Sequence, residues 1–197
     1  GVAKKEGDVE QAFAKAARTL EGAEGYVADA QRAARFLREH LWQPSSQTLL
    51  RRYRGGSAGV EAYAEDYAYL IFGLLELFQA DGDVAWLEWA ITLQARQDEL
   101  FWDPIDGGWF STTGRDESVL LRLKEDYDGA EPAAGSVSVL NLLVLSHLVG
   151  SFSEKIERSL GVFASRISQS GRVAPMMLAA LSTYHAGTSQ LVLVGDP

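Results

Sequence analysis

An internal repeat constrains the fold of this chain more than any single motif does. Three short motifs recur after 60 positions: LWQP at 41–44 and FWDP at 101–104, LL at 49–50 and WF at 109–110, and EDY at 65–67 and again at 125–127. Each unit therefore contains an amphipathic helix, a W-x-P stop, a short extended piece, an E-D-Y motif and an apolar helix. A chain built from such units is expected to stack helical hairpins.

Helical spacing of apolar residues predicts seven helices, at Val9–Leu20, Tyr26–Leu41, Glu65–Ala80, Val84–Leu100, Glu131–Leu148, Ser153–Ile167 and Val173–His185. The third and fifth are apolar nearly all round, whereas the fourth is amphipathic, with Glu88, Gln94, Arg96 and Asp98 on its polar face. Short strands are expected at 49–53 and 190–194, and a short hairpin from 107–110 and 119–123. The alternation of helix types predicts two layers, with the amphipathic helices outside and the apolar helices inside.

Stacked hairpins of this kind form either an open solenoid or a closed α/α toroid. The predicted connections from outer to inner helices are long, whereas solenoids usually keep such connections short. Long loops gathered at one rim favour the toroid, with a site at that rim. The sequence therefore predicts a mainly α fold of stacked α-hairpins, with short β-hairpins at the rim and a short C-terminal strand.

Composition excludes several functional classes. The formal net charge of −9 argues against nucleic acid or an anionic membrane surface as the main partner. Cysteine is absent, so this chain offers no disulfide, thiolate or Cys-ligated metal. The three histidines are scattered, and neither a metal nor another cofactor is indicated. We expect an intracellular, most simply cytoplasmic, location.

A dense group of charges lies between 122 and 131, directly before the fifth predicted helix. It contains Lys124, Glu125, Asp126, Asp128 and Glu131. We interpret this group as the rim of a pocket. Because the repeat relates the two E-D-Y motifs, their carboxylates are expected at the same end of the fold, near its axis.

Carboxylates at a helix start have two interpretations: they act as acid and base, or they stabilise the positive end of the helix. Adjacent helical residues diverge by about 100°, so only one of Glu65 and Asp66 can face the axis. Asp66 is favoured, because Glu65 can bind backbone amides. The catalytic candidates are Asp66, Asp126 and Asp128. Capping is favoured for Glu65 and Glu131, which are retained as candidates for substrate contact.

The remaining candidates for substrate contact also have two interpretations. Arg122 and Lys124 either bind an anionic group of a sugar or pair with Asp126 and Asp128, and pairing is favoured. Trp109 and Tyr127 either stack on a sugar face or pack in the core. Core packing is favoured for aromatic residues at repeat-equivalent positions.

Several runs resemble the spermatogenesis-associated protein 20 family. They are EDYAYLIFGLLELF at 65–78, WLEWAITLQ at 86–94, GGWF at 107–110, RLKEDYDGAEPAAGSVS at 122–138 and VLVGDP at 192–197. The resemblance extends from about Tyr26 to the last residue. It implies a six-hairpin α/α domain similar to N-acylglucosamine 2-epimerase and six-hairpin glycosidase toroids, following a thioredoxin-like domain. That upstream domain and the first hairpins are missing here, so residues 1–197 are expected to form one partial toroid domain.

The resemblance implies a carbohydrate-active or carbohydrate-binding domain, with acid and base chemistry if it is an enzyme. The implied partners are a small carbohydrate and the missing upstream part of the same protein. The alternative is a non-catalytic helical scaffold that supports a thioredoxin-like redox domain or a protein partner. A third reading is a fragment without activity of its own. The histidine base of the similar epimerases has no matching motif in this chain, which counts against epimerase chemistry by this segment alone.

Overall fold

The computed structural model describes residues 24–115, 121–125, 127–129, 131–169 and 174–187. Its helices are α2 (Glu24–His40), α3 (Ala64–Asp81), α4 (Val84–Phe101), α5 (Ala134–Leu148), α6 (Ser153–Gln169) and α7 (Pro175–Ala186). Its strands are β1 (Trp42–Gln43), β2 (Thr48–Arg54) and β3 (Ser57–Glu61). The helix predicted at 9–20 and the strand predicted at 190–194 lie outside the described residues.

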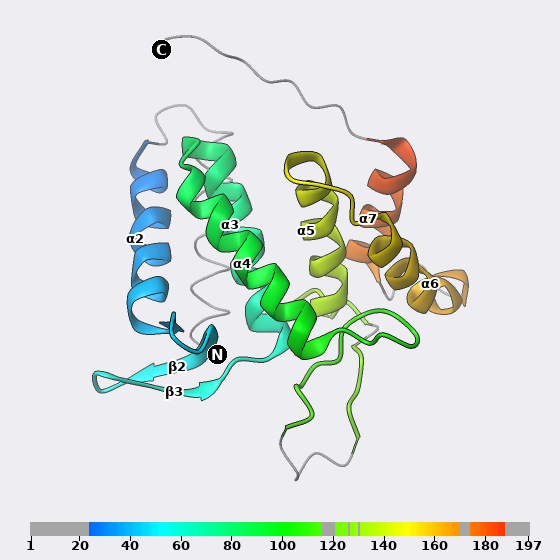
Figure 1. The fold of residues 1–197 in the computed structure, drawn as a ribbon. Coiled ribbons are helices and arrows are strands. Elements are labelled where there is room, and N and C mark those ends of the chain that lie inside the picture. Colours follow the sequence, from blue (N-terminus) through cyan, green and yellow to red (C-terminus); the bar gives the residue numbers. More distant parts are fainter. Residues whose placement is uncertain (1–23, 116–120, 126, 130, 170–173, 188–197) are drawn as a thin grey trace.

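The helices form two layers, as predicted (Figure 1). α3 packs against α2, α4 and α5, and α5 packs against α3, α6 and α7, so α3, α5 and α7 form the inner layer. α3 and α5 are apolar on nearly every face because neighbours cover them on several sides. Their buried residues include Leu70, Leu74, Val137 and Leu142, none of which exposes any measurable surface.

The three inner helices run in the same direction and begin at the same end of the molecule, the lower end in Figure 1. The outer helices α2 and α4 run the opposite way. The connections from α2 to α3 and from α4 to α5 therefore begin and end at this lower end. We call this end the rim, as the sequence analysis did.

The first rim connection, residues 41–63, forms a three-stranded antiparallel sheet in the order β1-β2-β3. Gly55 and Gly56, both with positive φ, close the β2–β3 hairpin. The sequence analysis predicted the strand now seen as β2. Gly59 lies in β3, for which no strand was expected.

The strand pairing confirms part of the repeat. Trp42 pairs with Leu49 in the first connection, and Trp102 pairs with Trp109 in the second, so both partners are shifted by 60 positions. Beyond that bridge, the described part of the predicted hairpin at 107–123 is joined by a backbone hydrogen bond from the Ser111 N–H to the Leu123 carbonyl. The described residues there form no strand.

The repeat does not extend to the E-D-Y motifs. α5 begins at Ala134, 70 positions after Ala64 at the start of α3, because the second rim connection is longer. Glu65 and Asp66 therefore lie in the first turn of α3. Glu125 lies in an exposed loop well before α5, and Asp126 is outside the described residues. The predicted equivalence of the two motifs is wrong.

Candidate functional site

The start of α3 carries a compact charged cluster. The Asp66 carboxylate accepts a hydrogen bond of 2.9 Å from the N–H of Tyr63, the residue that precedes the helix. Arg51 reaches over from β2, with its guanidinium 3.1 Å from the Glu65 carboxylate and 3.4 Å from that of Asp66. The same guanidinium lies 4.0 Å from the centre of the Tyr63 ring. One arginine thus joins both acidic residues to an aromatic side chain.

Asp66 is fully buried, and its Oδ1 atom has no hydrogen-bond partner within the described part of the chain. Burial raises the pKa of this carboxyl group, because the charged form loses its hydration. The Tyr63 N–H and Arg51 act in the opposite direction without cancelling the effect. A buried carboxyl with a raised pKa holds its proton at a higher pH than an ordinary aspartate and is suited to general-acid chemistry.

A cavity of about 350 Å³ lies at the rim beside this cluster. We call it the rim cavity; it is lined by Val60, Glu61, Ala62, Tyr63, Thr112, Thr113 and Arg115. It lies where the two rim connections meet, since the Ala64 N–H donates to the Ser111 carbonyl. None of the nine site residues predicted from the sequence is among those lining residues. The carboxylate in its lining is Glu61.

Two features of the rim cavity are unusual for a loop junction. Val60 has a φ of 66°, which a β-branched residue rarely adopts. The Thr112 hydroxyl is buried and has no hydrogen-bond partner among the residues that the structure describes. Strained backbone and unsatisfied polar groups occur more often at functional sites than elsewhere.

Asp128 has a different environment from Asp66. One oxygen accepts a hydrogen bond of 2.8 Å from the Ala133 N–H at the start of α5. The other accepts from the N–H groups of Met176 and Met177, at 2.8 and 3.3 Å, in the first turn of α7. Asp128 is almost fully buried, at 5% exposed. The carboxylate therefore caps two adjacent inner helices, as the capping interpretation predicted.

Lys124 and Arg122 do not make the predicted pairs among the described residues. The Lys124 ammonium lies 2.6 Å from the Asp103 carboxylate and donates to the Gly107 carbonyl at 2.7 Å. Arg122 donates to the carbonyls of Thr112 and Leu100, and its guanidinium lies 4.1 Å from the centre of the Phe110 ring. Pairing with Asp128 is absent because backbone N–H groups already occupy that carboxylate.

The other predicted residues are dispersed. Trp109 is buried, packs edge-on against Trp102 and donates its indole N–H to Asp98, so core packing explains it. Tyr127 is 60% exposed, and Glu131 is also exposed. Of the predicted candidates, Glu65 and Asp66 therefore lie together at the rim, whereas Trp109 belongs to the core.

Asp98 is a polar centre that the sequence analysis assigned to the solvent face of α4. It accepts hydrogen bonds from Gln94 and Trp109 and forms an ion pair with Lys155 of α6. The neighbouring Gln97 is fully buried and donates to the Ala64 carbonyl and the Ser138 hydroxyl. The polar face of α4 is thus covered by α6 and by the second rim connection. The polar residues of α4 do not show in the sequence that other segments pack over them.

The Lys124–Asp103 pair predicts a stability change at acid pH. The Lys124 ammonium lowers the pKa of Asp103 to about 2, from an ordinary value of 3.8. A lowered pKa stabilises the fold above pH 4, and this contribution is lost as the pH falls from about 4 to about 2. Lys124→Met is expected to cost about 1–3 kcal/mol at pH 7 and much less at pH 2. Urea unfolding at both pH values measures the difference, and an equal loss at both would contradict the assignment.

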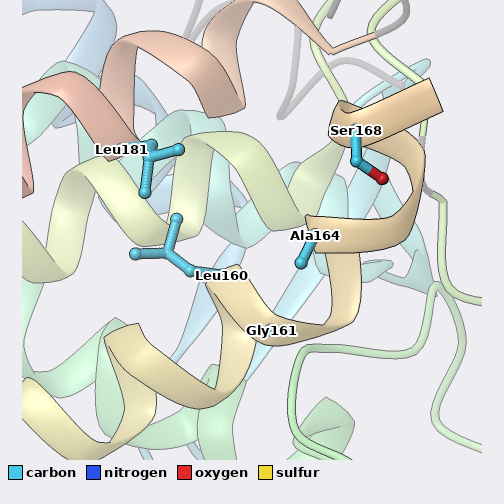
Figure 2. Close-up of a pocket in the computed structure, with 5 residues that line it drawn as sticks. All are labelled: Leu160, Gly161, Ala164, Ser168 and Leu181. Carbon is cyan, nitrogen blue, oxygen red and sulfur yellow. The ribbon is translucent and has the colours of Figure 1, made fainter. Parts of the chain in front are cut away.

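A second hollow, of about 360 Å³, lies between α6 and α7 (Figure 2). Its lining is almost entirely apolar and consists of Leu160, Gly161, Ala164 and Ser168 from α6 and Leu181 from α7. α7 is as apolar as an inner helix should be, yet only Met177 and Ala180 within it are buried. One side of this inner helix is therefore uncovered in the described structure.

The described residues contain no group of three or more histidine or acidic side chains placed to hold a metal ion. None of the helices described is long and apolar enough to cross a membrane.

Comparison with known proteins gives a consistent picture. Spermatogenesis-associated protein 20 from mouse is 41% identical over 187 residues, covering 89% of this chain and 24% of that protein. The human protein of the same name is 40% identical over 178 residues, covering 85% and 23%. This chain thus spans about a quarter of the length of the curated relatives that it matches. No family model matches.

The fold is also found among solved structures. Cellobiose 2-epimerase from Spirochaeta thermophila superposes with a TM-score of 0.64, at 16% identity, covering 86% of this chain and 44% of the epimerase. At this identity the likeness concerns the fold alone. It agrees with the predicted α/α toroid architecture.

Proposed function

Because the chain belongs to the spermatogenesis-associated protein 20 family, as a segment of about a quarter of its members' length, we propose that it supplies a carbohydrate-binding site to a larger α/α toroid. The site lies at the rim, where the inner helices begin. The observation that supports this proposal best is the rim cavity beside the buried Asp66 carboxyl. A cavity of about 350 Å³ falls within the usual range of about 300–1,000 Å³ for small-molecule sites.

The lining of the rim cavity suits a sugar. Sugars combine hydroxyl groups with apolar C–H faces, and the cavity offers both kinds of contact. Glu61 and Arg115 supply an acceptor and donors, Thr112 and Thr113 supply hydroxyls, and Tyr63 supplies an apolar ring. The fold shared with an epimerase that acts on cellobiose is the second line of support.

In this proposal Asp66 is a positioning residue: its carboxyl, whose pKa is raised, is fully buried outside the cavity lining and holds the Tyr63 N–H and Arg51. The Arg51 guanidinium forms ion pairs with both Glu65 and Asp66. Asp128 stabilises two helix starts and takes no part in proton transfer. Asp126 remains a prediction, as it lies outside the described residues.

The test uses the full-length protein and a panel of neutral monosaccharides and disaccharides. We expect millimolar or tighter binding by calorimetry, and a loss of any turnover in Asp66→Asn. The matched control is Asp83→Asn, which changes the aspartate that caps α4 at the opposite end of the molecule. Absence of binding across the panel would remove the proposal, and so would equal effects of the two substitutions.

A helical scaffold is the second candidate function, and the apolar hollow between α6 and α7 favours it. An inner helix with an exposed apolar face, such as α7, is expected to be buried by another segment of chain. The matched relatives are about four times longer than this chain and could supply that segment. If the domain is a scaffold, the segment that packs on α6 and α7 is another part of the same protein. The substitution test above separates the two functions, since a scaffold keeps its function in both Asp66→Asn and Asp83→Asn.

A further inference from the structure

Tyr63 occupies a position that helix capping does not explain. The residue before a helix is most often Ser, Thr, Asp or Asn, whose side chains accept a backbone N–H. Tyr63 stands at this position in α3, where its backbone N–H donates to the Asp66 carboxylate as part of a capping box. Its side chain is 40% exposed and lines the rim cavity. An aromatic ring kept half-exposed at a cavity wall is available for contact with a ligand.

Arg51 fixes the orientation of that ring. Its guanidinium lies 4.0 Å from the ring centre and is itself held by the carboxylates of Glu65 and Asp66. The Arg51 side chain is only 18% exposed and is not among the residues that line the cavity. One part of the Tyr63 ring is therefore covered by a fixed cation, and the remaining surface is presented to the cavity. A ring ordered before binding loses little conformational entropy on contact with a ligand.

The polar groups around the ring indicate the charge of the ligand. Glu61 and Arg115 bring one negative and one positive charge to the lining, so the cavity selects neither cations nor anions strongly. The lining also contains Thr112, whose buried hydroxyl has no hydrogen-bond partner among the described residues. The chain as a whole is strongly acidic, which disfavours phosphorylated ligands.

We propose that Tyr63 is a stacking platform for the apolar face of a neutral pyranose in the rim cavity, and that Arg51 is the positioning residue that holds its ring. The inference rests on the proposed carbohydrate function and adds the class of sugar and the residue that recognises it. Arg51 touches no ligand in this arrangement and acts through Tyr63. The hydroxyl groups of the sugar face Glu61, Thr112 and Arg115.

The first experiment needs no variant. Cellobiose and methyl glucoside are titrated into the full-length protein and observed by proton NMR. Stacking on Tyr63 is expected to move the sugar C–H signals of one ring face upfield, because those protons enter the shielding region of an aromatic ring. Glucuronate and glucose 6-phosphate serve as charged counterparts and are expected to bind at least tenfold more weakly. Tighter binding of either charged sugar would overturn the assignment of a neutral ligand.

The second experiment assigns the residues. Tyr63→Phe is expected to retain binding, whereas Tyr63→Leu, which keeps an apolar side chain without a ring, is expected to weaken it roughly tenfold. Arg51→Lys keeps the charge and loses the planar contact, and a loss of about threefold is expected. In the Tyr63→Leu background, Arg51→Lys should cause no further loss, which a general loss of stability would not reproduce.

The outcomes separate this inference from the proposed function. If the unmodified protein binds no sugar, the proposed function fails. If it binds sugar and Tyr63→Leu binds equally well, with thermal unfolding unchanged, the carbohydrate function stands and the stacking platform is wrong. If Arg51→Lys weakens binding equally in both backgrounds, Arg51 does not act through Tyr63.

Discussion

Asp128→Ala is expected to lower the free energy of unfolding by about 3 kcal/mol, because three charge-assisted hydrogen bonds disappear together. The carboxylate accepts from Ala133 before α5 and from Met176 and Met177 in α7. Loss of a single cap costs about 1 kcal/mol, and this residue serves two helices. Because these helices belong to the inner layer, the loss should affect the whole fold. Urea unfolding followed by circular dichroism measures it.

Asp128→Asn provides the matched control, since it keeps one acceptor oxygen and removes the charge. It is expected to cost about half as much, because one helix start retains its partner while the other faces an amide donor. Tyr127→Ala, at the exposed neighbouring position, should change the stability by less than about 0.5 kcal/mol. A loss below 1 kcal/mol in Asp128→Ala would show that the bridge between α5 and α7 contributes little.

Asp98→Ala is expected to be similarly destabilising, by about 3 kcal/mol. The substitution leaves the Lys155 ammonium without its partner and the indole N–H of Trp109 without an acceptor. Breaking one side of a buried ion pair typically costs about 3–5 kcal/mol, and the partial exposure of Lys155 reduces this figure. The measurement is the shift of the urea midpoint relative to the unmodified protein.

The double variant Asp98→Ala with Lys155→Met tests the cause. Removing both charges should recover part of the lost stability, because no uncompensated ammonium remains between α4 and α6. Glu88→Ala, on the same helix, is the control for the loss of a negative charge. Additive losses in the double variant would mean that the two side chains do not interact in solution.

The helical layers could be predicted from the sequence because their cause is local. Helical periodicity and the share of apolar residues on each face show how many sides of a helix are covered. The repeat was equally informative where the paired residues are close in the sequence, as in the pairing of Trp42 with Leu49 and of Trp102 with Trp109. It failed for the E-D-Y motifs, since their identical sequences do not reveal that the first motif lies inside its helix whereas six residues separate the second motif from its helix.

The candidate site was only partly predictable. Asp66 and Glu65 follow from their position at a helix start. Arg51 and Thr112 were missed because they come from different rim connections and meet the α3 start only in the folded chain. Asp98 was assigned to solvent because polar residues on one helical face usually lie there. No pattern along the chain shows that a neighbouring helix will cover that face.

The unequal rim connections have an evolutionary consequence. The first connection uses 23 residues (41–63) and the second 32 (102–133), yet α3 and α5 lie side by side in the same layer. At the opposite end, two residues join α3 to α4 and four join α5 to α6. Lengthening a loop costs little, about 0.6 kcal/mol per doubling. Insertions can therefore accumulate at one end, so new specificities can arise there while the helical framework is inherited unchanged.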